Sequence, residues 1–184
     1  MMLEICNNFS INEHEFIELD KKFGKLCWFV SHELKRKNSK NNCTEEAEDI
    51  KQDLLISMMR AGSYTKRQVY IEKCLLVANK YVKDDFVKSI IQELENLWSN
   101  RTKHGANRQK YGPHQEELLE SIIRQSVPEV ERPDKKAPLK IDTKFSTYCK
   151  SIVWNTQKAH GRQISKMKFI RNNQVSLSEN GHLL

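Results

Sequence analysis

The stretch KFSTYCKSIVWN, residues 144–155, has the spacing of a helix with two contrasting faces. At about 100° per residue, one face gathers small and apolar side chains. They are Phe145, Cys149, Ile152, Val153 and Thr156. The opposite face carries Thr147, Lys150, Ser151, Trp154 and Lys158, flanked by Tyr148 and Asn155. The pattern predicts a helix that packs on one side and presents lysines and aromatic rings on the other.

Basic residues gather around and after this helix. Seven lysines and arginines, and no acid, lie between Asp142 and Glu179, whereas the preceding part of the chain is close to neutral. Most of the net charge of +7 therefore belongs to the last quarter of the sequence. Because this run lacks the acidic i,i+4 partners of an ordinary solvated face, we interpret it as a binding surface. Nucleic acid is favoured as its partner over a membrane surface or an acidic protein.

Helical periodicity also dominates upstream, and glycine and proline are scarce, so the sequence predicts an all-α fold. Helices are expected over 12–37, with Phe29 in the apolar face, and over 44–61, with Ile56 in the apolar face. Gly62 and Ser63 are expected to end the second helix. Residues 65–99 predict two helices or a bend near Lys83–Asp85. A loop at 100–112, a helix at 114–126, a proline-punctuated linker and helices from about 144 to 171 complete the prediction.

Several classes of protein fit this sequence poorly. No apolar run approaches the roughly 20 residues of a membrane span, and the start resembles no signal peptide, so we expect a cytoplasmic protein. Five scattered cysteines without a CxxC pair argue against a disulfide framework or a zinc site. Phosphate-loop, dinucleotide-binding and hydrolase motifs are absent, and His104 and His114 have no convincing co-ligands. We expect no metal and no cofactor, although an acid–base pair among the many carboxylates stays open.

Three stretches, in this order, resemble region two of bacterial sigma factors, the subunits that bind core RNA polymerase and open promoters. KLCWFVSHELKRKN, residues 25–38, is similar to the helix before the polymerase-binding one. AEDIKQDLLISMMRA, residues 47–61, resembles the polymerase-binding helix itself. The matching positions are Asp49, Gln52, Asp53, Ser57, Met58, Met59, Arg60 and Ala61. KFSTYCKSIVWN resembles the promoter-melting helix, with its Lys-Phe-Ser-Thr-Tyr opening.

The chain also departs from the family pattern. Ser151 and Ile152 stand where primary sigma factors have a tryptophan pair, and Trp154-Asn155 resembles a step of bacteriophage late-gene and extracytoplasmic-function sigma factors. The family places only a few residues between the two motifs. We therefore expect four parts, without a helix-turn-helix domain. They are the N-terminal half of region two (1–64), an inserted helical module and linker (65–139), promoter-melting and basic helices (140–172) and an extended C-terminal tail (173–184).

The resemblance implies a sigma factor, not itself an enzyme, that directs recognition and melting of a −10-like promoter element, as in transcription of phage late genes in the bacterial host cytoplasm. The resemblance implies that five residues contact the clamp helices of the polymerase β′ subunit: Asp49, Gln52, Asp53, Met58 and Arg60. Contacts with promoter DNA, duplex and melted, fall to Lys144, Phe145, Thr147, Tyr148, Lys150, Ser151, Trp154, Asn155, Lys158, Arg162 and Lys166. The resemblance implies that the Tyr148 ring stacks on the flipped adenine of the −10 element. The tail, ending in His182-Leu183-Leu184, takes the place that docks on the polymerase flap, a sliding clamp or a co-activator.

Two other functions stay open. The chain is alternatively a regulator that keeps the polymerase-binding helix and occludes or redirects the enzyme without melting promoters. It is otherwise a small nucleic-acid-processing enzyme that uses the basic face. Two single residues are equally open. Trp154 is either a DNA-facing ring or a packing contact with the helices of 65–126, and Phe145 lies on the apolar stripe that predicts core.

Overall fold

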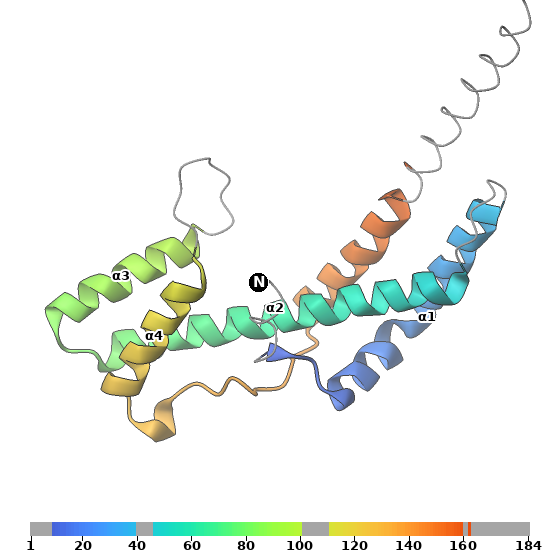
Figure 1. The fold of residues 1–184 in the computed structure, drawn as a ribbon. Helices are drawn as coiled ribbons and strands as arrows, with labels where there is room; N and C mark the ends of the chain where they lie inside the picture. Colours follow the sequence, from blue (N-terminus) through green and yellow to red (C-terminus); the bar gives the residue numbers. More distant parts are fainter. Residues whose placement is uncertain (1–8, 40–45, 101–110, 160–161, 163–184) are drawn as a thin grey trace, which may run out of the picture. The chain divides into compact units, whose positions relative to one another are not determined.

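The computed structural model describes residues 9–39, 46–100, 111–159 and 162, and its regular elements are helices (Figure 1). In chain order they are α1 (Glu13–Ser39), α2 (Ala47–Tyr81), α3 (Asp85–Ser99), α4 (Pro113–Ser126) and the short 3₁₀ turn η2 (Glu129–Glu131). A further helix covers residues 143–159. No strand occurs in the described ranges, and the predicted all-α class is confirmed.

The chain divides into two compact units, each with its own apolar core. The α1 unit comprises Ile11–Gly62 and Leu139–Leu184, and the α3–α4 unit comprises Met1–Ser10 and Ser63–Pro138. Helix α2 contributes residues to both. Both units are discontinuous in sequence, because Leu139–Leu184 falls with Ile11–Gly62, and Met1–Ser10 falls with Ser63–Pro138.

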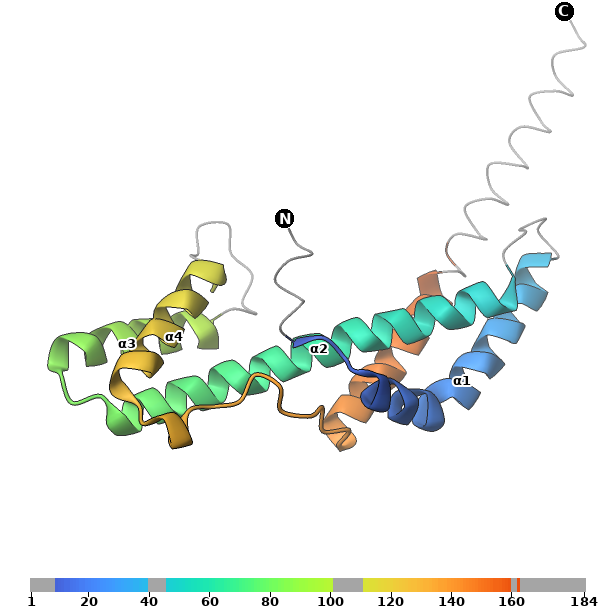
Figure 2. The ribbon, with the colours of Figure 1, turned by 60° about the horizontal axis from the view of Figure 1, so that its bottom comes forward.

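In the α1 unit, α1 and the 143–159 helix run side by side in the same direction (Figure 1, Figure 2). Two hydrogen bonds fix this pairing. Lys22 Nζ donates to the Ile141 carbonyl at 3.1 Å near one end, and Gln157 Nε2 donates to the Glu33 carboxylate at 3.3 Å near the other. Between them lies a core of buried side chains from α1, the first part of α2 and the 143–159 helix. Its members include Leu19, Phe23, Cys27, Leu34, Ile50, Leu54, Met58, Phe145, Cys149 and Val153.

Helix α2 does not end at Gly62 and Ser63, so that prediction was wrong. Gly62 is buried, and a Cβ atom there would lie 2.7 Å from Ile11 Cδ1 and 3.0 Å from Leu139 Cδ2. Gly62 therefore lies in close contact with two chain segments that are remote in sequence, where an added Cβ would require the Ile11 and Leu139 side chains to shift, and it does not cap the helix. The predicted helix start at Thr44 lies outside the described residues.

A buried carboxylate joins the entry of α1 to the segment that leads into the 143–159 helix. Asn12 and Glu15 form a reciprocal cap, in which each side chain accepts a hydrogen bond at 2.9 Å from the backbone N–H of the other. The second oxygen of Glu15 accepts a bond at 2.6 Å from the Leu139 backbone N–H. Because Glu15 is only 3% exposed, these bonds satisfy a charge that would otherwise be costly to bury.

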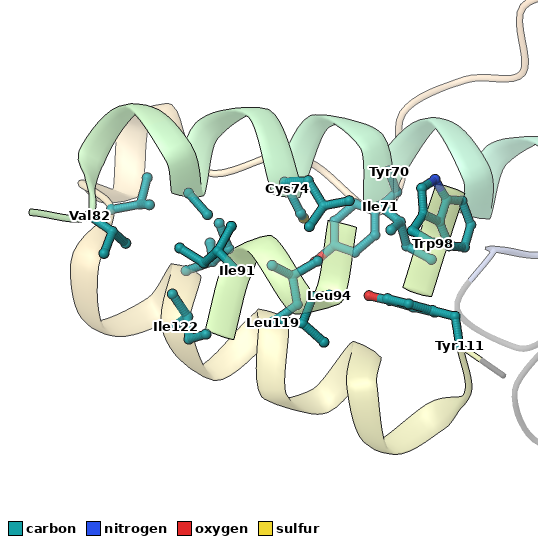
Figure 3. Close-up of a cluster of buried hydrophobic side chains, with 14 of the residues drawn as sticks. Tyr70, Ile71, Cys74, Val82, Ile91, Leu94, Trp98, Tyr111, Leu119 and Ile122 are labelled. Atoms are coloured by element: carbon teal, nitrogen blue, oxygen red, sulfur yellow. The ribbon is translucent and has the colours of Figure 1, made fainter. Parts of the chain in front are cut away.

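The α3–α4 unit encloses a separate cluster formed by the second part of α2 with α3 and α4. Figure 3 shows Val82 at one end of this cluster, Trp98 and Tyr111 at the other, and Ile71, Ile91, Leu94 and Leu119 between them. The chain leaves α2 after Tyr81, and the Asp84 side chain caps α3 by accepting from the Val87 N–H at 2.9 Å. The predicted interruption near Lys83–Asp85 is confirmed.

Candidate nucleic-acid and protein-binding surfaces

The 143–159 helix is held at its start by its own sequence. The Asp142 side chain accepts a hydrogen bond at 2.8 Å from the Phe145 N–H, which makes Asp142 the N-cap. The carbonyl just before it, on Ile141, accepts from Lys22 of α1. The direction of the helix is therefore fixed relative to α1 within the same unit.

The predicted solvent face of this helix is exposed. Tyr148 is 48% and Trp154 58% exposed, and the flanking polar residues are exposed as well. These are Lys144, Thr147, Lys150, Ser151, Asn155 and Lys158. Arg162 is exposed too, whereas Lys166 and the tail 173–184 lie outside the described residues. The sequence pattern thus located an aromatic and cationic surface, while its binding role stays a prediction.

Trp154 and Lys158 form a local pair on this face. Lys158 Nζ lies 5.2 Å from the centroid of the Trp154 ring, one helical turn away. At an exposed site such a cation–π contact is worth about 0.5–1 kcal/mol, enough to favour one orientation of both side chains. The pair offers an incoming polyanion a positive charge and a stacking ring at the same place.

Three hydroxyls on the helix are engaged by its own backbone. Ser146 Oγ donates to the Asp142 carbonyl at 2.7 Å, Thr147 Oγ1 to Thr143 at 2.9 Å, and Ser151 Oγ to Thr147 at 3.0 Å. Phosphate oxygens only accept hydrogen bonds, so a phosphate contact through the Thr147 or Ser151 hydroxyl must first break such a bond. The lysines and aromatic rings are therefore the stronger binding groups on this surface.

Two predicted contact residues lie in the core instead. Phe145 is 3% exposed and Met58 is fully buried, and both belong to the apolar cluster of the α1 unit. Phe145 shares the face of its helix with Cys149 and Val153, and Met58 continues the buried row of Ile50 and Leu54 on α2. Neither side chain reaches the surface, so we assign both to packing and correct their place among the contact residues.

The remaining predicted polymerase-binding residues form one exposed stripe on the first part of α2. Asp49, Gln52, Asp53 and Arg60 are exposed at helical spacing. Ile56 lies in the middle of this stripe and is 43% exposed, although the sequence placed it in the apolar face. The buried row passes through Leu54 and Met58, and Ile56 falls on the opposite side of the helix. We name these five residues the α2 stripe. It consists of one aliphatic side chain and four polar ones: Ile56, Asp49, Gln52, Asp53 and Arg60.

A second surface of the α1 unit was missed. Trp28 and Phe29 of α1 are 52% and 61% exposed, and they line an open depression of about 710 Å³ together with one acidic and three basic residues, Asp20, Lys21, Lys25 and Lys51. The Trp28 ring is in contact with His32, with 4.3 Å between ring centroids. Phe29 was predicted as core, but Cys27 and Val30 occupy the buried row and turn it outward. The available signal was one lysine, Lys25, which lies three residues before Trp28 and four before Phe29.

The described thiols are buried and act as small apolar groups. Burial raises the pKa of Cys27, Cys74 and Cys149 to about 11 in each case. At neutral pH these thiols are protonated, and a protonated buried thiol is a poor nucleophile. Catalysis by a cysteine thiolate therefore has no support among these three residues.

The part of the chain that the structure describes contains neither a metal-ligating cluster nor a helix that could span a membrane. No three His, Cys, Asp or Glu side chains there are placed to hold a metal ion together. In the same residues, no helix combines the length and the apolar character needed to cross a bilayer. No family model, curated protein or solved structure matches this chain.

Proposed function

We propose that this chain is a sigma factor, which binds core RNA polymerase and melts a −10-like promoter element at transcription initiation. The observation that carries the proposal is the exposed face of the 143–159 helix. There Tyr148 and Trp154 project among lysines, in a stretch of sequence without acids. Aromatic rings stack on unpaired bases and lysines neutralise phosphates, and strand separation requires both.

Tyr148 is the base-binding residue in this mechanism. Extruding a base from the duplex costs a few kcal/mol, and stacking on an aromatic ring returns about 1–3 kcal/mol per base. Lys144, Lys150 and Lys158 hold the backbone on either side, which gives affinity without sequence information. Trp154, oriented by Lys158, provides a second stacking ring about one and two-thirds turns further along the helix.

The α2 stripe is the polymerase-binding surface in this proposal. An exposed isoleucine ringed by Asp49, Gln52, Asp53 and Arg60 combines a small apolar anchor with a polar rim. Both surfaces belong to the α1 unit, whose helices share one core. Docking through the α2 stripe therefore delivers the 143–159 helix to DNA in a fixed orientation.

Transcription in vitro separates the proposal from its rivals. Purified chain and core polymerase, supplied with a promoter library, should yield transcripts that start downstream of a shared −10-like sequence. A regulator that occludes the enzyme would bind core polymerase and yield no such transcripts. A nucleic-acid-processing enzyme would cleave DNA without polymerase when divalent metal is added. Either of these two outcomes would exclude the sigma assignment.

A further inference from the structure

The α3–α4 unit has a pocket that the proposed function does not use. It measures about 400 Å³ and lies where α2, α4 and the segment after η2 meet. Its lining includes Tyr70 of α2, Glu120 and Arg124 of α4, and Arg132 and Lys135 of the segment after η2. All of these residues belong to the same unit, so the pocket lies within it.

Three cations share one carboxylate in this pocket. Lys135 Nζ lies 2.5 Å from one oxygen of Glu120, and Arg124 Nη2 lies 3.6 Å from the other. Arg132 is the third cation, and Glu120 is the one acid among the described residues that line the pocket. The lining therefore has an excess of two positive charges, which a dianion would neutralise.

The guanidinium of Arg132 is fixed in place by the end of α4. Its Nε donates to the Val127 carbonyl at 3.0 Å, and its Nη2 donates to the Arg124 carbonyl at 2.9 Å. These bonds use two of the five N–H donors of a guanidinium, so three further donors are not used by them. They also engage carbonyl groups at the end of α4 that would otherwise repel an anion.

Lys135 is positioned as well. Its Nζ contacts Glu120 and lies 5.6 Å from the centroid of the buried Tyr70 ring. An anion that enters the pocket would thus meet donors from two segments whose positions are already set. Such preorganisation lowers the entropy that binding costs.

We propose that this pocket binds a phosphate dianion, either inorganic phosphate or the terminal phosphate of a small molecule. The Arg132 donors would hold phosphate oxygens, and Arg124 and Lys135 would turn from Glu120 toward the anion. A phosphate monoester carries a charge of about −1.5 to −2 at pH 7 and accepts hydrogen bonds through three oxygens, which suits three cations with an excess of two charges. A carboxylate would leave one positive charge unmatched.

The surroundings favour a small ligand over nucleic acid. Glu129, Glu131 and Asp134 are exposed and alternate with Arg132 and Lys135 along the same segment. A long polyanion would bring further phosphates against these carboxylates, whereas a single phosphate group would not. A bound phosphate would bridge α4 and the segment after η2, and would stabilise the folded chain by mass action. The inference does not depend on the sigma assignment, because the pocket has no residue of the α1 unit among the described residues that line it.

Titration calorimetry of the full chain with inorganic phosphate tests the site. Sodium chloride keeps the ionic strength constant, so that general screening does not contribute. We expect saturable binding of one phosphate per chain. Glycerol phosphate distinguishes the two sources of the ligand: tighter binding than that of inorganic phosphate would identify a small-molecule monoester, and weaker binding would identify the free anion.

A pair of double variants identifies the residues. Arg124→Gln with Lys135→Gln should weaken phosphate binding about tenfold or more, and it keeps both backbone hydrogen bonds of Arg132. Lys73→Gln with Lys83→Gln makes the same change of net charge at exposed positions of the same unit, and should have little effect.

Removal of the shared carboxylate should act in the opposite direction. Glu120→Gln releases Arg124 and Lys135 from their ion pairs, so phosphate binding should tighten by roughly threefold or more. Glu93→Gln, at an exposed position of α3, makes the same change of net charge and should leave the affinity nearly unchanged.

Three results would overturn the proposal. The first is the absence of saturable phosphate binding at constant ionic strength. The second is an equal loss of affinity in the two double variants, which would mean that only net charge matters. The third is displacement of bound phosphate by duplex DNA, which would assign the pocket to a nucleic-acid backbone.

Discussion

The two units of this chain use the same kinds of side chain in opposite ways. In the α1 unit, Trp28 lies beside lysines of an open depression and Trp154 lies against Lys158, and both rings are more than half exposed. In the α3–α4 unit, Trp98 and Tyr111 are buried edge to face, with 4.9 Å between ring centroids. Aromatic rings therefore lie beside lysines on the surface of one unit and inside the core of the other. We expect substitution of a buried ring to harm folding and substitution of an exposed ring to harm binding.

The largest expected effect is the loss of a core ring. Trp98→Ala should lower the free energy of unfolding by about 3–5 kcal/mol, because it removes a buried indole and leaves a cavity beside Tyr111. Trp154→Ala, at a 58% exposed position, should change it by about 1 kcal/mol or less, since it removes only the cation–π contact with Lys158. Urea denaturation followed by circular dichroism measures both values. Equal losses would refute the contrast between a structural and a surface tryptophan.

The next effect concerns promoter opening. Tyr148→Ala should reduce it about tenfold to a hundredfold, since stacking on one base is worth about 1–3 kcal/mol, and should leave binding to core polymerase unchanged. Permanganate reactivity of unpaired thymines reports the opening. Tyr64→Ala is the matched control, because Tyr64 is 44% exposed, close to the 48% of Tyr148, but lies on α2. A parallel loss of opening and of polymerase binding would refute the base-stacking role.

A smaller effect is expected on polymerase affinity. Ile56→Ala should weaken binding to core polymerase by about 1–2 kcal/mol, as expected for an apolar anchor at the centre of a polar stripe. Val69→Ala provides a close control, because Val69 lies on the same helix and, like Ile56, is 43% exposed, but belongs to the other unit. Co-purification and fluorescence titration with core polymerase measure the difference. Equal affinities of the two variants would remove the α2 stripe from the interface.

Local patterns in the sequence were sufficient for part of this structure. The buried face with Cys149 and Val153 and the break capped by Asp84 were predictable, because helical periodicity and a capping carboxylate act within a few residues. Gly62 was misjudged because its contacts, Ile11 and Leu139, are far away in the sequence. Phe29 and Ile56 were wrongly predicted to be buried because both helices carry apolar residues on several sides. Packing against the neighbouring helices decides which side is buried, and the periodicity of one helix does not show it.

The smallest predicted effect is also the most specific to charge. Lys158→Ala should reduce affinity for DNA only a few-fold and to a similar extent for all sequences, because a phosphate contact carries no base information. The slope of log affinity against log salt concentration should fall by about 0.9 on duplex and 0.7 on a single strand, the value for one counterion. Lys73→Ala, exposed on α2 in the other unit, should leave the slope unchanged. An unchanged slope in Lys158→Ala would leave Lys158 only the role of orienting Trp154, and would move the phosphate contacts elsewhere on the helix.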